Sequence, residues 1–111
     1  MNWNQITSLN QVEDIKILSE DENILIFKHS TRCPTSSMAL NRVERNWNTE
    51  NNQKLKPFLL DLIQYREISN LIAKEFEVEH QSPQAILIQK GKATFNTSHL
   101  SISLPDILEQ C

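Results

Sequence analysis

Cysteine is scarce in this chain of 111 residues, and one of its two copies lies where a thiol could react. Cys33 ends an apolar stretch and is followed directly by Pro34, within the sequence HSTRCPTSSM. Proline suits the first position of a helix, because its missing N–H would have no partner there. Cys33 would then be the N-cap, where the helix dipole and the N–H groups of Thr35 and Ser36 favour a thiolate. This pattern predicts a nucleophilic cysteine.

Ser36 stands where a redox enzyme often carries a second cysteine. A C-x-x-C dithiol can resolve its own mixed disulfide, whereas Cys33 needs another thiol, either Cys111 or one from outside the chain. We expect Cys33 to perform thiol–disulfide exchange, assisted by the charge of Arg32 and by a hydrogen bond from the Ser36 hydroxyl. The competing interpretation is that Cys33 is a small buried hydrophobic residue without chemistry.

Hydrophobic spacing predicts the elements that must position Cys33. Strands alternate with helices, which implies parallel neighbours joined by right-handed crossovers, and a hairpin adds antiparallel strands. The prediction is one α/β domain over residues 1–111 with a four-stranded mixed sheet, in which Cys33 lies where open sheets place ligands. The predicted elements, in order, are a helix at Leu9–Glu20, a strand buried on both faces at Ile24–Lys28, a helix from Pro34 to Trp47, a strand at Pro57–Asp61, a helix at Tyr65–Phe76, strands at Ala85–Gln89 and Lys92–Phe95, and a helix after Ser103.

Composition and charge narrow the class of function. Net charge is −3 and no basic block is present, so nothing predicts a nucleic-acid partner. The apolar runs are too short to cross a bilayer, and the N-terminus lacks the pattern of a signal peptide. Two distant cysteines do not form a secreted disulfide framework. We therefore expect a cytoplasmic protein without a membrane partner.

The three histidines, His29, His80 and His99, lack the spacing of a metal site, so no metal is predicted. His29 is the best placed, four residues before Cys33. It could transfer protons at the thiol, or its ring could be hydrogen-bonded beneath the active-site loop.

A second signal is Pro83, which follows Ser82 just before a predicted strand. Proline cannot donate to a sheet ladder, so it suits the beginning of a strand. Taken alone, this bond is expected to be trans, because cis bonds are a small minority before proline.

Three stretches, KHSTRCPTSSMAL, DLIQYREISNLIAKEFEVEHQSPQAILIQKGK and TSHLSI, together resemble the YtxJ family of monothiol bacilliredoxins (BrxC-type). The resemblance covers about Ile24 to Ile102 and implies a thioredoxin-like three-layer sandwich. The family signature is of the T-C-P-I-S type. Here the sequence from Thr31 to Ser36 has an arginine, Arg32, before the cysteine and a threonine, Thr35, in place of isoleucine.

The resemblance also implies a chemistry. Bacillithiol is a cysteinyl-glucosaminyl-malate thiol, and Cys33 would remove it from mixed disulfides with client proteins during oxidative stress. A second bacillithiol would then release the enzyme, and a separate flavoprotein reductase would recycle the bacillithiol disulfide. No tightly bound cofactor is expected.

The same resemblance implies a substrate site around Cys33. Pro83 would be cis and face the cysteine, while the backbone of Ser82 would bind an extended, sulfur-bearing substrate. Lys28 and Arg32 could bind the malate carboxylates, although both could equally be solvated surface charges. Thr31, Ser82 and Gln84 could meet the sugar hydroxyls.

Two other functions fit the same residues. One is a redox protein that forms a disulfide between Cys33 and Cys111, although we prefer to interpret Cys111 as a dispensable surface thiol. The other is a thioredoxin-like binding module without turnover. The sequence leaves client proteins, redox potential and oligomeric state open.

Overall fold

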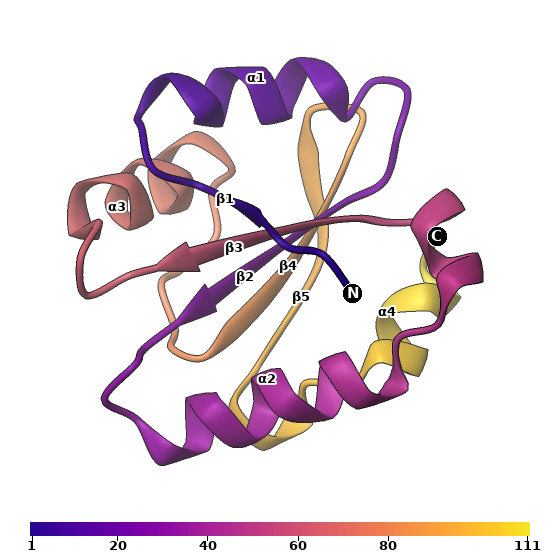
Figure 1. The fold of residues 1–111 in the computed structure, drawn as a ribbon. Helices are drawn as coiled ribbons and strands as arrows, with labels where there is room; N and C mark the ends of the chain where they lie inside the picture. The colour runs from indigo at the N-terminus through magenta and orange to yellow at the C-terminus, as the bar shows by residue number, and fades with distance from the viewer.

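A mixed sheet of five strands forms the centre of the computed structural model, which describes residues 1–111 (Figure 1). The spatial order is β1-β3-β2-β4-β5; β1, β3 and β2 are parallel, whereas β4 and β5 are antiparallel to their neighbours. The strands are β1 (Asn4–Gln5), β2 (Ile24–His29), β3 (Lys56–Asp61), β4 (Gln84–Gln89) and β5 (Lys92–Ser98). The predicted α/β sandwich with a mixed sheet is confirmed. The predicted number of four strands is wrong, because β1 has two exposed residues and no apolar pattern.

Four α-helices cover the sheet, at the places predicted from the sequence. Helices α1 and α3 lie on one face and α2 and α4 on the other, which gives three layers (Figure 1). The helices are α1 (Asn10–Leu18), α2 (Pro34–Asn46), α3 (Arg66–Glu75) and α4 (Leu104–Glu109), with short 3-10 helices η1 (Thr49–Gln53) and η2 (His99–Ser101). None of the helices is long and apolar enough to cross a membrane.

The alternation of side chains along β2 decides which layer each residue faces. Ile24 and Ile26 belong to the core under α1 and α3, whereas Leu25 and Phe27 belong to the core under α2 and α4. Successive residues keep this alternation at the carboxyl end of the strand. Lys28 therefore contacts α3 through Ser69, and the next residue contacts α2.

Candidate active site

Cys33 is the residue at which the chain passes from the turn after β2 into helix α2. Its N–H donates to the carbonyl oxygen of Ser30 over 3.2 Å, which closes the turn. Its backbone is extended (φ −108°, ψ 115°) at the N-cap, and Pro34 begins the helix. The thiol is free and half-buried. Cys33 thus lies at the predicted place, between the end of a strand and the start of a helix.

The predicted hydrogen bonds to the Cys33 sulfur are not formed in this conformation. The side chain makes no capping hydrogen bond to α2. The Ser36 hydroxyl is fully buried and serves other groups: Ser36 Oγ lies 2.6 Å from His29 Nδ1 and accepts the Ser30 N–H over 3.0 Å. A hydroxyl that accepts from Ser30 can give its one proton to His29. The expectation that Ser36 donates to Cys33 is therefore wrong.

His29 is held beneath the active-site turn by this hydrogen bond. Burial lowers the pKa of His29, although the charges of Asp61 and Glu44 partly oppose the shift. In the tautomer protonated at Nε2, the neutral ring presents Nδ1 as an acceptor, which matches a hydrogen bond from Ser36. Of the two roles considered for His29, the contacts favour the structural one, in which its ring supports the turn.

The Ser82–Pro83 peptide bond is cis, as the resemblance implied. In the antiparallel ladder of β2 and β4, Gln84 pairs with Lys28, so the adjacent Pro83 lies beside the carboxyl end of β2. The cis proline and Cys33 therefore lie at the same end of the sheet, where β2 ends and β4 begins. Pro83 is buried, and the buried hydroxyl oxygen of Ser82 has no hydrogen-bond partner.

Two residues expected to bind substrate are instead part of the protein interior. Lys28 has no exposed surface; its Nζ donates to the carbonyl oxygen of Ser69 over 3.1 Å and lies 3.3 Å from His80 Nδ1. Burial lowers the pKa of Lys28 to about 8. Lys28 is thus neither a surface charge nor a ligand for a carboxylate, because the strand buried on both faces extends through this residue.

Gln84 is also fully buried, and its amide is satisfied within its own segment. The side-chain oxygen accepts the N–H of Gln81 over 3.3 Å, and the side-chain nitrogen donates to the carbonyl oxygen of Glu79 over 3.0 Å. Because the side chain has no exposed surface, its amide cannot reach a sugar hydroxyl. Thr31 and Arg32, by contrast, are exposed beside the thiol, and Arg32 forms no ion pair.

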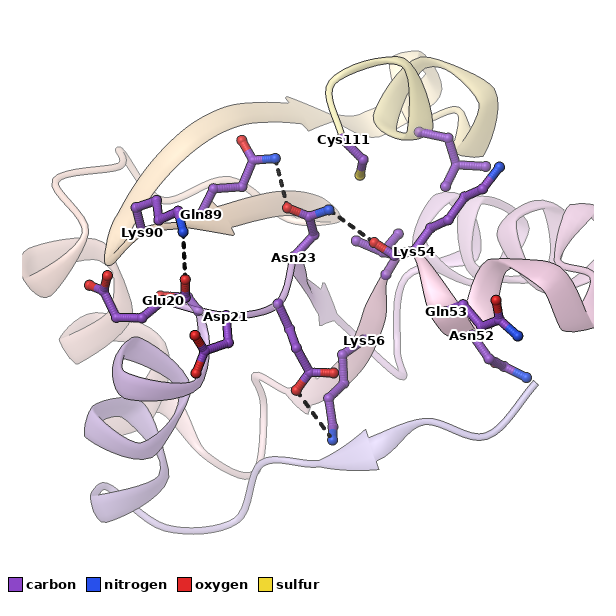
Figure 2. Close-up of a pocket in the computed structure, with 14 residues that line it drawn as sticks. Glu20, Asp21, Asn23, Asn52, Gln53, Lys54, Lys56, Gln89, Lys90 and Cys111 are labelled. Carbon is purple, nitrogen blue, oxygen red and sulfur yellow. Dashed lines mark hydrogen bonds and ion pairs between the residues drawn. The ribbon is translucent and has the colours of Figure 1, made fainter.

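Cys111 lies at the opposite end of the sheet from Cys33. It borders a polar pocket of about 430 Å³ together with Asn23, which immediately precedes β2, and Gln89, which ends β4 (Figure 2). The six residues of β2 span about 17 Å between this pocket and the active-site turn. A disulfide needs Cα atoms within about 7 Å. Burial raises the pKa of the Cys111 thiol, with a smaller opposite effect from Lys54.

The remaining histidines contact other segments, and the N–H of His99 donates to the carbonyl oxygen of Pro83 over 3.0 Å. His80 contacts Ser69 of α3 and Lys28 of β2, and His99 is exposed in η2. No group of three or more His, Cys, Asp and Glu side chains is arranged to hold a metal ion.

Sequence reasoning missed the contacts among Lys28, His80 and Ser69. The signal was present, because Lys28 ends a run predicted to be buried on both faces. A lysine in such a run needs internal hydrogen-bond acceptors.

Residues 4–107 match the family described as monothiol bacilliredoxin BrxC. The chain belongs to this family.

Solved structures agree on the fold of this bacilliredoxin. A protein described as having a thioredoxin fold and a suggested oxidoreductase activity is 27% identical, with a TM-score of 0.80, covering 96% of this chain and 90% of that one. The thioredoxin Mala s 13 of Malassezia sympodialis is 18% identical, with a TM-score of 0.77 and coverage of 98% and 90%. Fasciola hepatica thioredoxin is 16% identical, with a TM-score of 0.71 and coverage of 96% and 94%. Family and fold together establish a thioredoxin-like redox protein.

Proposed function

We propose that this bacilliredoxin removes bacillithiol from mixed disulfides on client proteins, with Cys33 as the nucleophile. The observation that carries the proposal is a single free, half-buried thiol at the start of α2, with buried Ser36 in place of a second cysteine. No thiol within the chain stands near Cys33 to resolve an intermediate. A small external thiol is the simplest partner for such a site.

In the first step the Cys33 thiolate attacks the bacillithiol sulfur of the client mixed disulfide. A new S–S bond joins Cys33 to bacillithiol as the old bond breaks, and the client cysteine leaves as a thiolate that takes a proton from water. The client is reduced, and Cys33 now carries the bacillithiol.

In the second step the thiolate of another bacillithiol attacks the bacillithiol sulfur attached to Cys33. The products are bacillithiol disulfide and the free Cys33 thiolate, so two electrons pass from bacillithiol to the client over the full cycle. A flavoprotein reductase would regenerate bacillithiol. The enzyme needs no tightly bound cofactor, and its dependence on a reduced thiol pool favours the cytoplasm.

Substrate recognition would use the end of the sheet at which Cys33 and Pro83 both lie. The backbone of Ser82 can bind an extended substrate, whereas the Ser82 hydroxyl oxygen is buried and would have to turn outward to reach one. Arg32 is exposed without an ion pair, so its guanidinium is available to the malate carboxylates of bacillithiol.

The test uses a client protein that carries one bacillithiol mixed disulfide, with excess bacillithiol as reductant. We expect the wild-type protein to reduce the client, Cys33→Ser to be inactive, and the matched control Cys111→Ser to retain wild-type activity. The assignment of the nucleophile is wrong if Cys33→Ser retains activity while Cys111→Ser loses it. An inactive wild-type protein with a fully reduced Cys33 contradicts the function itself and favours a binding module.

A further inference from the structure

An ammonium group without a carboxylate partner lies inside the protein, at the end of the sheet that carries Cys33 and Pro83. Lys28 is fully buried and takes part in neither of the ion pairs of the structure. Its Nζ atom instead contacts the carbonyl oxygen of Ser69 in α3, at 3.1 Å, and the Nδ1 atom of His80, at 3.3 Å. Burying a charge in this way is costly, so its contacts call for an explanation beyond packing.

His80 belongs to the segment that connects α3 to β4 and ends in the cis peptide bond at Pro83. Its Nδ1 atom also lies 3.3 Å from the Ser69 hydroxyl. Burial lowers the pKa of His80, and the charges of Lys28 and Arg66 lower it further. A neutral ring with Nδ1 as acceptor is what a donating ammonium requires. Lys28 thus ties this segment to α3.

Gln84 secures the other end of the same segment. Its amide accepts the N–H of Gln81 and donates to the carbonyl oxygen of Glu79, which closes residues 79–84 into a compact loop. Gln84 also pairs with Lys28 in the ladder between β4 and β2. The buried side chains of two paired residues therefore hold both ends of the loop that carries Ser82 and Pro83.

We propose that Lys28 and His80 are positioning residues, which hold loop 79–84 so that Ser82 and the cis proline present a fixed surface to the disulfide substrate at Cys33. This inference rests on the proposed function, since the surface matters only if a substrate binds there. Neither side chain touches the reacting sulfur atoms. Their effect should appear in substrate binding rather than in the chemical step.

Two substitutions test the contact from either side. Lys28→Met keeps the length of the side chain and removes the ammonium, while His80→Leu removes the acceptor. His80→Asn is the conservative variant, because its amide oxygen can replace Nδ1 as acceptor. Lys92→Met is the matched control, since Lys92 is exposed on β5.

The first measurement is hydrogen–deuterium exchange in peptides covering residues 79–84, which requires no substrate. We expect faster exchange in Lys28→Met and His80→Leu, and exchange at the wild-type rate in His80→Asn and Lys92→Met. Folded Lys28→Met or His80→Leu with wild-type exchange in this loop overturns the inference. If one of these two variants fails to fold, the other decides.

The second measurement is steady-state reduction of the bacillithiolated client. We expect KM to rise roughly tenfold in Lys28→Met and His80→Leu with little change in kcat, the effect of one lost hydrogen bond on binding. A loosened loop with unchanged KM also overturns the inference. If the wild-type protein itself is inactive, the proposed function fails, and the exchange data still show whether the two residues hold the loop.

Discussion

The serine at position 36 changes the site in two ways. It removes the internal thiol that would otherwise resolve a mixed disulfide on Cys33, so the reaction depends on an outside thiol. It also supplies a buried hydroxyl that connects His29 to the N–H of Ser30. The residue that makes the site monothiol therefore also fixes the turn that leads to Cys33.

Replacing Ser36 with alanine should destabilise the protein. The substitution leaves the Ser30 N–H and the His29 ring nitrogen without a partner beneath the turn, and such losses cost about 2 kcal/mol. Urea unfolding measures the change in the free energy of unfolding. The matched control is Ser37→Ala in the same helix turn, for which we expect a change within about 0.5 kcal/mol. Equal unfolding midpoints for the two variants would contradict the role assigned to Ser36.

Some residues of the site could be placed from the neighbouring sequence, and others could not. Cys33 and Pro34 could be placed from the sequence because a strand, a proline and an amphipathic helix follow one another directly. The contacts predicted for three other residues are wrong, because the partners depend on how distant segments pack; these residues are Ser36, Lys28 and Gln84. Two residues predicted to bind substrate, Lys28 and Gln84, are fully buried and do not reach the surface.

At the scale of elements, the hydrophobic periodicity was a reliable guide. Every predicted helix and strand is present, with ends displaced by a few residues, because each contributes apolar side chains to one or both of the two cores. Strand β1 escaped prediction because two exposed residues carry no such pattern. It joins the sheet through pairing with β3, where Asn4 Nδ2 also donates to the carbonyl oxygen of Pro57 over 3.1 Å.

The burial of Lys28 at the end of β2 predicts that the free energy of unfolding increases at alkaline pH. Lys28 has a pKa of about 8 in the folded protein, against the ordinary value of 10.5. Between these values the folded protein has lost the proton while the unfolded chain keeps it, so the free energy of unfolding rises with pH. The cost of burying the charge is complete below pH 8 and is relieved by about pH 10.5. After allowance for screening by water, we expect a gain of about 2 kcal/mol.

Urea unfolding at pH 7.5 and pH 10, compared between wild type and Lys28→Met, isolates this contribution. The variant should lack the gain, whereas Lys92→Met should keep it because Lys92 is exposed. The same pH dependence in wild type and Lys28→Met would show that Lys28 is not buried as described.

At the scale of the whole molecule, the sheet separates the two thiols. Cys33 follows the carboxyl end of β2, and Cys111 borders the pocket beside its amino end (Figure 2). The alternative of a redox protein that cycles between these cysteines would require α4 to leave the sheet, exposing Leu104 and Ile107, which are buried. The fold thus favours a site with one working thiol.

Oxidation should therefore leave the two cysteines unlinked within one chain. Mild treatment with a small disulfide such as bacillithiol disulfide should give mixed disulfides, and unreduced peptide mapping should find no fragment that joins Cys33 to Cys111. The Cys111→Ser variant should form the same adduct on Cys33 at the same rate. A cross-linked fragment in high yield, absent from Cys111→Ser, would support the dithiol alternative instead.

The most direct test of the central claim is to follow the bacillithiol group itself. The protein is mixed with a bacillithiolated client without free bacillithiol, quenched by acid, and analysed by intact mass and peptide mapping. We predict that one bacillithiol appears on Cys33 for each client cysteine that becomes reduced. A client that stays modified while Cys33 remains a free thiol, or a bacillithiol group found on Cys111, would contradict it.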